Sequence, residues 1–379
     1  MIDNIDKDNM YQSILDFSDN MLDAVKLGGS IKFLNDYSNI NKIIVAGMGG
    51  SAIGGDVTYA LVNDEIKIPF LVIRGYNIPS WVDSSTFVIC SSYSGNTEET
   101  ISILDEAHTK GAKVCAITTG GKIGKICDKY NYDKVIIPSG MQPRAALAFS
   151  FIPILYILYS LNIISTNITF SLVSLSKLIK ENSKKYSMKD DNNPIWVLAK
   201  KIYNKIPIIY ADSDRLQTVA VRLKGQICEN GKILAYHSVF PEMNHNEIVG
   251  WEKNSELFSN YFIIWLFDND MNERNKVRQK IVMDMLNEIG VDQSKLEVPG
   301  SSFIDRFLLL IHYGDWLSYW CAILHKIDPS PVKNIDIAIS TKFVCGRLGS
   351  MALGEVRMAS ADRQDSPKAM NNREPSLPA

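Results

Sequence analysis

The sequence lacks most of the features of a secreted, metal-binding or nucleic-acid-binding protein. Its six cysteines are scattered over 379 residues without a C-x-x-C pair, which argues against a disulfide framework or a zinc site and for a reducing compartment. No two of the five histidines have the H-x-x-x-H spacing of metal ligands. The 40 Lys and Arg balance 42 Asp and Glu, and this net charge of −2 excludes a general polyanion binder. We expect a cytoplasmic protein that binds neither a metal nor nucleic acid.

The sequence also has little that could enter a membrane. Its first residues are polar and acidic, unlike a signal peptide. One uncharged stretch of about 20 residues, 145–164, has the length of a membrane span, but Pro153 and several polar residues interrupt it. We interpret this stretch as a buried or interfacial helix and expect no membrane association.

Short apolar runs alternate with helical patterns along most of the chain, which is typical of an α/β protein with parallel sheets. Buried strands are expected in two series, at 42–47, 70–74, 86–91, 113–118 and 134–138, and then at 206–211, 233–237 and 261–267. Helices are expected at 51–62, 97–110, 214–228, 272–289 and 302–325. The polar stretch 181–193 is the expected linker between the two series.

The two series predict two doubly wound units, each a mainly parallel sheet flanked by helices. We place an N-terminal segment at 1–20, the first unit at 21–165 and the second unit at 166–342. The last 37 residues, 343–379, have no isoleucine, one lysine and four arginines, whereas 28 lysines and 7 arginines precede them. This shift indicates a disordered tail or a foreign segment, such as a fusion or frameshift, which we exclude from the fold.

A glycine-rich segment, GMGGSAIGGD at 47–56, follows the first expected strand and opens a helix. Glycines let the backbone approach a ligand closely, and a helix N-terminus favours an anion. The spacing also fits a relaxed dinucleotide-binding fingerprint, but the second strand ends at Arg74, where an acidic residue usually holds the ribose of NAD. NAD is therefore disfavoured, whereas NADP stays open.

A second segment, SSYSGNTEET at 91–100, also joins a strand to a helix. Ser92, Ser94 and Thr97 place three hydroxyls around a glycine turn, and with nearby backbone N–H groups they can surround a phosphate. The alternative is ordinary capping of the helix by one hydroxyl. Because one hydroxyl would be enough for a cap, the surplus favours a phosphate site.

These two segments together resemble the sugar isomerase (SIS) domain, a doubly wound fold that binds sugar phosphates. Further segments resemble the bifunctional phosphoglucose/phosphomannose isomerases, in chain order PRAAL at 143–147, ENGK at 229–232, PEMNHNEIVGW at 241–251, GDWLSY at 314–319 and DPSPV at 328–332. The resemblance covers residues from about 20 to about 338. It implies two SIS domains, a homodimer, no cofactor, and interconversion of glucose 6-phosphate or mannose 6-phosphate with fructose 6-phosphate.

An aldose–ketose isomerase must open the sugar ring and then move a proton between C1 and C2 through an enediolate, which suits a carboxylate base. Glu229 follows the helix expected at 214–228, where the dipole disfavours a negative charge and makes the carboxylate a better proton acceptor. By the resemblance Glu229 is this base, and His245 of the partner subunit opens the ring. A solvated glutamate at a helix end is the alternative for Glu229. We interpret Glu247 as an orienting residue and the histidines at 108, 237, 312 and 325 as structural.

The resemblance also implies that Arg144 stabilises the enediolate, while the backbone N–H groups of Gly49 and Gly50 line the reacting carbons. A charge at the start of an apolar helix is the alternative for Arg144. We count Ser51 among the substrate-binding residues. Ser330 is a candidate for tolerating both configurations at C2.

The sequence departs from the family pattern near its end. The family has a leucine–lysine pair shortly after D-P-x-P-V, and that lysine lies in the active site. Here the position falls near Ala338 and Ile339, and the nearest lysine is Lys342, about three residues further on. Either Lys342 substitutes through a change of register, or the native C-terminus is missing and activity is impaired.

Other functions explain the sequence less well. The isomerase half of glucosamine-6-phosphate synthase needs a cysteine glutaminase domain before it, but the first cysteine is residue 90. A SIS sugar-phosphate sensor usually carries a helix-turn-helix domain and has no need of Glu229 and His245. A dehydrogenase leaves the hydroxyls at 92–97 unexplained. A pseudoenzyme and a single-substrate phosphosugar isomerase stay open.

Overall fold

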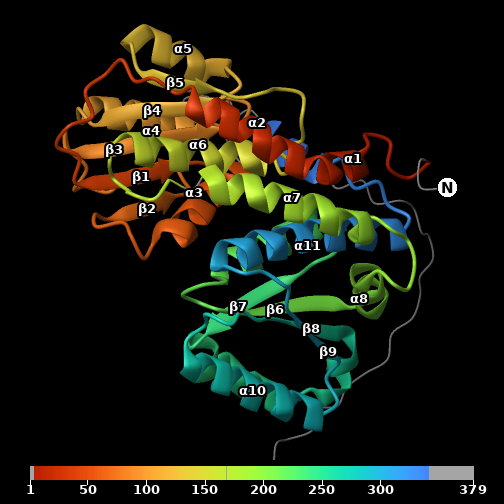
Figure 1. Ribbon diagram of the computed structural model, residues 1–379. Helices are drawn as coiled ribbons and strands as arrows, with labels where there is room; N and C mark the ends of the chain where they lie inside the picture. The colour runs from red at the N-terminus through yellow and green to blue at the C-terminus, as the bar shows by residue number, and fades with distance from the viewer. Residues whose placement is uncertain (1–3, 168, 341–379) are drawn as a thin grey trace, which may run out of the picture. The chain divides into compact units, whose positions relative to one another are not determined.

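The computed structural model describes residues 4–167 and 169–340 (Figure 1). The chain divides after Val332 into a large compact unit, which contains both sheets, and a short C-terminal unit, which begins with the helix α12 (Lys333–Ser340). Lys342 and the expected tail, 343–379, lie outside the described residues.

The first sheet is parallel and has the strand order β2-β1-β3-β4-β5. Its strands are β1 (Lys42–Ala46), β2 (Phe70–Ile73), β3 (Thr86–Ser92), β4 (Lys113–Thr118) and β5 (Asp133–Ile136). One face packs against α4 (Glu98–Thr109) and α5 (Gly121–Tyr130), and the other against α3 (Gly49–Val62) and α6 (Leu147–Ser160). Because both faces are covered, the strands are continuous apolar runs, as the sequence indicates.

The second sheet is also parallel and has the order β7-β6-β8-β9. Its strands are β6 (Ile206–Asp212), β7 (Tyr236–Phe240), β8 (Tyr261–Leu266) and β9 (Gln293–Leu296). One face shares a hydrophobic cluster with α8 (Pro194–Ile202), α9 (Gln217–Glu229) and α11 (Phe303–Leu324). The other face packs against α10 (Glu273–Glu288) and the short 3-10 turns η1 (Glu242–His245), η2 (Glu247–Glu252) and η3 (Ser255–Asn260).

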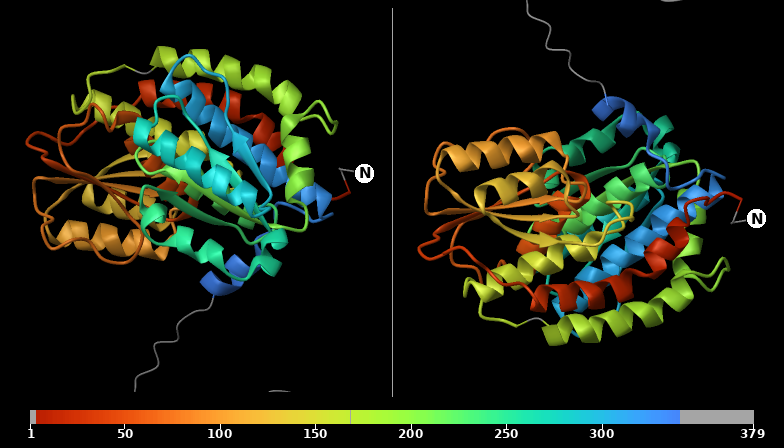
Figure 2. Two further views of the ribbon diagram at one scale, coloured as in Figure 1. Left: turned by 90° about the horizontal axis from the view of Figure 1, so that it is seen from below. Right: turned by 90° about the horizontal axis from the view of Figure 1, so that it is seen from above.

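One hydrophobic cluster joins the facing sides of the two sheets, with Val45 and Ile117 from the first sheet and Ile209 and Ile264 from the second. The helices α2 (Phe17–Gly29) and α7 (Thr169–Tyr186) lie side by side, and α7 also contacts α11 (Figure 2). The short helix α1 (Met10–Leu15) contacts the same α11. The two sheets are therefore built on one continuous core.

Two apolar helices occupy this core. The stretch 145–164 forms α6, which is buried along most of its length, so its interpretation as a buried helix is confirmed. The helix α11 has the length and hydropathy of a membrane span, but 94% of its most apolar window is buried inside the protein, as in a core helix.

The structure confirms the predicted fold class, two parallel sheets flanked by helices, and corrects two expected elements. The stretch 181–193 is no linker, because its first part completes α7 and Asn193 caps α8. The polar residues of its helical part, such as Lys184 and Lys185, lie on the exposed side of an amphipathic helix. The strand expected at 233–237 lies three positions later, at β7. The half-exposed edge strand β9, with its polar sequence QSKL, was not expected, and neither were the helices α1, α2, α5, α7, α8 and α12. The domain boundaries stay predictions.

Candidate active site

The strand order of the first sheet reverses between β1 and β3, so a crevice opens beyond their carboxyl ends. The two motif segments leave the sheet here, and the Oγ atom of Ser51 accepts a hydrogen bond from the backbone N–H of Tyr93 at 3.2 Å, which ties them together. A Cβ atom on Gly47 would lie 2.9 Å from the carbonyl oxygen of Ser91. Only glycine therefore lets the segments pass this closely.

The hydroxyl segment is folded around Gly95, whose N–H donates to the Oγ atom of Ser92 at 3.1 Å. The hydroxyls of Ser92 and Thr97 lie 2.8 Å apart, and Ser94 accepts a hydrogen bond from the backbone of Asn96. Thr97 is the N-cap residue of α4, yet within the described residues its side chain makes no capping hydrogen bond. The arrangement therefore differs from an ordinary side-chain cap, and the helix N-terminus keeps its capacity for an anion.

Four of the expected site residues line one pocket of about 200 Å³. They are Gly49 and Gly50 from the start of α3, Arg144, and Glu229 from the end of α9. A Cβ atom on Gly50 would lie 2.9 Å from the carbonyl oxygen of Pro143, so glycine lets the segment of Arg144 approach. The rest of the lining comprises Ile53, Arg74, Val221, Arg222, Lys224, Gly225, Gln226 and His237.

Arg144 is held by neutral acceptors. Its Nε atom donates to Oδ1 of Asn230 at 2.6 Å, and one NH2 group donates to the carbonyls of Pro329 and Ser330 at 2.9 and 2.8 Å. The other terminal nitrogen, NH1, lies 3.8 Å from Oε2 of Glu229. The side chain is only 5% exposed, and burial lowers the pKa of Arg144, while Glu229 acts to raise it. A guanidinium stays protonated under these conditions, so a fixed positive charge lies beside Glu229.

Glu229 ends α9, and its side chain is 32% exposed. The ammonium group of Lys232 donates to the backbone carbonyl of Glu229 and to that of Pro329, at 3.0 Å for the latter. Burial lowers the pKa of Lys232, and the neighbouring Arg144 lowers it further. Glu229 therefore lies at a helix C-terminus near the cationic side chains of Arg144 and Lys232, and it lines the pocket.

The remaining expected residues lie elsewhere. Ser330 gives its carbonyl to Arg144, and its hydroxyl is buried without a partner among the residues the structure describes. His245 is exposed in η1 and does not line the pocket of its own chain. Glu247 accepts a hydrogen bond from the hydroxyl of Tyr210 at 2.6 Å.

His237 and Arg222 were missed by the sequence interpretation. His237 was expected to be structural but lines the pocket, where burial and nearby Lys224 lower its pKa. Arg222 and Gln226 line it as well. They precede Glu229 by seven and three residues, a helical spacing that places them on the same side of α9 and could have revealed them.

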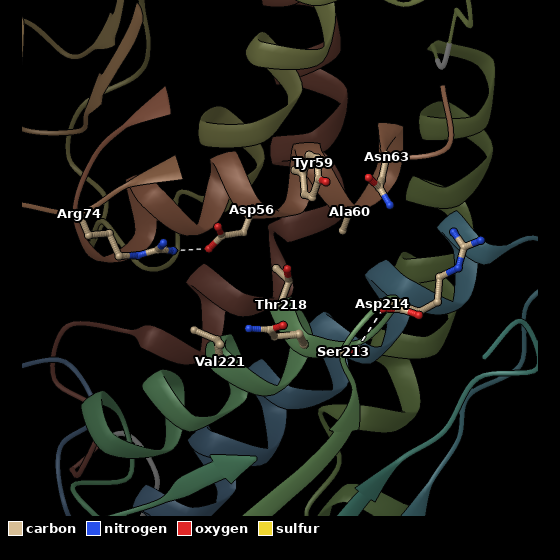
Figure 3. Close-up of a pocket in the computed structure, with 11 residues that line it drawn as sticks. Asp56, Tyr59, Ala60, Asn63, Arg74, Ser213, Asp214, Thr218 and Val221 are labelled. Carbon is tan, nitrogen blue, oxygen red and sulfur yellow. Dashed lines mark hydrogen bonds and ion pairs between the residues drawn. The ribbon is translucent and has the colours of Figure 1, made fainter. Parts of the chain in front are cut away.

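A second pocket, of about 300 Å³, adjoins the first and shares Arg74 and Val221 with it (Figure 3). Side chains from α3, among them Asp56, face the connection from β6 to α9 across this space. Arg74 forms an ion pair with Asp56 here. Across residues 4–167 and 169–340, no group of three or more His, Cys, Asp or Glu side chains is placed to hold a metal ion.

Comparisons with known proteins identify the fold and the family. A family model described as bacterial phospho-glucose isomerase C-terminal SIS domain matches residues 191–338. The solved C-terminal domain of glucosamine-fructose-6-phosphate aminotransferase from Francisella tularensis has a TM-score of 0.68 to this chain at 14% identity. The match covers 85% of this chain and 98% of that one. The fold is therefore that of the SIS-domain class.

The sequence relatives narrow the class further. The bifunctional phosphoglucose/phosphomannose isomerase of Caldicellulosiruptor bescii is 40% identical over 330 residues, 86% of this chain and 97% of the relative. The D-glucosamine-6-phosphate 4-epimerase of Sulfolobus acidocaldarius is 34% identical over 230 residues, 60% of this chain and 69% of the relative. The chain belongs to the bifunctional phosphoglucose/phosphomannose isomerase family, which confirms the resemblance and the predicted enzyme class, an isomerase.

Proposed function

We propose that this chain interconverts glucose 6-phosphate and mannose 6-phosphate with fructose 6-phosphate, by metal-independent proton transfer through an enediolate and without a cofactor. The observation that carries the proposal is the placement of Glu229, Arg144 and Gly50 in one pocket. The hydroxyl segment of β3 and α4 is tied to the same glycine-rich loop.

The phosphate binds at the crevice between β1 and β3. The hydroxyls of Ser92, Ser94 and Thr97 and the first turn of α4 donate hydrogen bonds to it, as an anion at a helix N-terminus requires. Ser51 holds the neighbouring loop in place through Tyr93. This anchor directs the open-chain sugar toward the pocket.

Glu229 is the general base. It removes the proton from C2 of the aldose and returns it to C1 of the enediolate, which gives the ketose. The NH1 group of Arg144 and the backbone N–H groups of Gly49 and Gly50 stabilise the negative oxygen that develops. Glucose and mannose differ only in configuration at C2, so loss of this proton gives the same enediolate from both.

His245 of a partner subunit opens the sugar ring, so the enzyme acts as a homodimer. Its exposure and its absence from the pocket lining of its own chain support a role across an interface. Lys342, beyond the described residues, is the proposed replacement for the family lysine. Ser330, next to Arg144, is the proposed point of tolerance at C2.

We also place the protein in the cytoplasm as a soluble enzyme. The cysteines of the described residues, at positions 90, 115, 127, 228 and 321, are free thiols. Four of them are buried, which suits a reducing compartment.

A sugar-phosphate epimerase is the second candidate, because the relative from Sulfolobus acidocaldarius is named a 4-epimerase. Epimerisation at C4 would leave C1 and C2 unchanged and would yield no ketose. The two functions therefore differ in product rather than in rate.

The test is an assay of the purified chain with glucose 6-phosphate, mannose 6-phosphate and glucosamine 6-phosphate, in the presence of EDTA. We expect fructose 6-phosphate from the first two substrates. Turnover of one hexose phosphate alone would contradict dual specificity, and loss of activity with EDTA would contradict metal independence. A C4 epimer from glucosamine 6-phosphate, without any ketose product, would favour the epimerase.

Subunit hybrids test the role of His245. Glu229→Gln and His245→Asn variants, each inactive alone, are unfolded, mixed and refolded together. If base and imidazole come from different subunits, half of the dimers are hybrids with one intact site in two, so about a quarter of the wild-type activity returns. A mixture that stays inactive, although its hybrids form, would place His245 outside the partner's site.

A further inference from the structure

The segment GDWLSY at 314–319 has no part in the mechanism above, yet it lies at the centre of α11. Asp315 and Ser318 are both buried there, and α11 packs directly on α9. A Cβ atom on Gly314 would lie 3.1 Å from the side chain of Leu223, so the two helices meet closely at this glycine. The two polar side chains therefore face the helix that carries Glu229.

Ser318 determines how the amide of Asn230 is oriented. Its hydroxyl donates to the carbonyl of Asp315 at 2.7 Å and so accepts a hydrogen bond from Nδ2 of Asn230 at 2.9 Å. The oxygen of the same amide then points to Arg144 and accepts from its Nε atom at 2.6 Å. Because Asn230 is fully buried, its amide depends on partners inside the protein rather than on bulk water.

Asp315 holds the backbone of Arg144 through Arg222. One oxygen of its carboxylate accepts from NH2 of Arg222 at 2.8 Å, and the other accepts from Gln226 at 2.8 Å. The same NH2 group also donates to the carbonyl of Arg144 at 3.0 Å. Asp315 and Arg222 are both buried, so this ion pair is little screened by solvent.

These contacts leave one part of Arg144 for the substrate. Its Nε and NH2 groups are bound by Asn230 and by two carbonyls. Among the residues that the structure describes, NH1 faces Glu229 and makes only one long hydrogen bond, 3.4 Å, to Gln142. The direction of NH1 is therefore decided by the partners of the other two nitrogens.

The geometry points to Asp315 and Ser318 as positioning residues, which act through Arg222 and Asn230 to hold NH1 of Arg144 toward the reacting carbons. This inference rests on the proposed function, in which Arg144 stabilises the enediolate. A charge that acts only on the transition state changes kcat rather than KM. At metal sites, loss of an outer hydrogen-bond partner of a ligand costs about tenfold to a hundredfold in activity, and we expect a loss of similar size here.

The test compares two buried serines, Ser318 within α11 and Ser183 of α7, which hydrogen-bonds to α11. Ser318→Ala removes the partner of Asn230, whereas Ser183→Ala removes a hydrogen bond of 2.6 Å to His312 on the same helix. We expect kcat to fall about tenfold to a hundredfold in Ser318→Ala, with KM unchanged within about twofold. In Ser183→Ala, kcat and KM should both stay at their wild-type values. An unchanged kcat in Ser318→Ala, or an equal loss in both variants, would overturn the inference.

Asp315→Asn provides a second test if Ser318→Ala does not fold. Its control is Asp268→Asn, because Asp268 forms a similar buried ion pair with Arg306, near the start of α11, at 2.6 Å. Both variants weaken a buried pair, so both lower the melting temperature. Only Asp315→Asn should lower kcat. A similar decrease of kcat in Asp268→Asn would mean that Asp315 stabilises the fold and does not position Arg144.

A crystal structure of Ser318→Ala separates failure of this inference from failure of the proposed function. We expect the Asn230 amide to turn and the guanidinium of Arg144 to leave its place. If the wild-type chain isomerises neither aldose phosphate, the proposed function fails, but the crystal structure still tests the positioning. Arg144 and Asn230 in their original places would overturn it.

Discussion

The two sheets have the same order around their first strands, β2-β1-β3 and β7-β6-β8, but their carboxyl ends differ in chemistry. The first sheet ends in glycine and hydroxyls, at Gly47 and Ser92. The second ends in two buried carboxylates, those of Asp212 and Asp268. A parallel sheet creates a crevice wherever its strand order reverses, but the side chains at that crevice decide what it can bind.

In the second sheet the carboxylate of Asp212 already binds the backbone N–H groups that would otherwise bind an anion. The carboxylate of Asp212 accepts hydrogen bonds from the backbone N–H groups of Asp214 and Arg215 at 3.0 and 2.9 Å, and from Asn275 at 2.6 Å. Asp268 is bound by Arg306. The carboxyl ends of the two sheets are therefore not two equivalent binding sites. The proposed function assigns the phosphate to the first sheet, while Glu229, from the helix α9 after β6, lines the same pocket as Gly49 and Gly50.

The largest expected effect is loss of Glu229, the proposed base. Glu229→Gln should lower kcat by about 10² to 10⁴ in steady-state assays, because an amide cannot accept the C2 proton. Glu288→Gln is the matched control, since Glu288 also ends a helix, α10, and is exposed. If Glu229→Gln kept most of the wild-type kcat, Glu229 would not be the base, and the second sheet and its helices would contribute no group to the proton transfer.

The next effect concerns the phosphate anchor. Thr97→Val keeps the shape of the side chain but removes a hydrogen bond to a charged group, which contributes about 1.5–3 kcal/mol. We therefore expect KM to rise about tenfold to a hundredfold, with little change in kcat. Ser213→Ala, after β6 of the second sheet, should leave KM unchanged. Equal effects in the two variants would contradict the difference between the sheets.

Asp212→Asn tests the second crevice directly. The new amide would face the amide of Asn275, so one hydrogen bond is lost and two donors meet. We expect the free energy of unfolding, measured with urea, to fall by about 2 kcal/mol, while KM stays the same. A rise in KM comparable to that of Thr97→Val would place the phosphate at the second sheet instead.

The last prediction concerns the core that both halves share. Burial lowers the pKa of His312 to about 3, well below the value of about 6.5 for an exposed histidine. Below pH 6.5 the unfolded chain therefore binds a proton that the folded chain does not, and stability falls as the pH falls.

At pH 5 this difference amounts to about 2 kcal/mol relative to pH 7. Urea unfolding at the two pH values should show it as one transition for both halves, because His312 lies in the core that joins them. His312→Gln should remove most of this pH dependence. Two separate transitions, or an equal pH dependence in the variant, would contradict the assignment.

The sequence predicted those parts of the molecule that depend on local pattern. Apolar runs followed by glycine or hydroxyl segments marked β1 and β3 and the loops that leave them. The edge strand β9 could not be predicted in this way, because its polar residues gain their place only by pairing with β8. The end of α7 resembled a linker for a related reason, since its buried residues alternate with many exposed lysines.

The sequence also predicted some residues of the site and missed others, because only some of them belong to a local pattern. Glu229 and Arg144 stand out by resemblance, and the structure places Oε2 of Glu229 3.8 Å from NH1 of Arg144. The roles of Arg222 and Asp315 depend on the packing of α9 against α11, which brings together residues 93 positions apart. No local pattern reports such a contact. His245 differs again, because its expected place lies on another subunit.

The most direct test of this account is a crystal structure of the wild-type chain with fructose 6-phosphate bound. We expect the phosphate oxygens about 2.7–3.0 Å from the hydroxyls of Ser92 and Thr97. We expect C1 and C2 about 3–3.5 Å from the carboxylate of Glu229. A phosphate bound beyond β6 and β8, or a sugar whose C1 and C2 lie out of reach of Glu229, would contradict it.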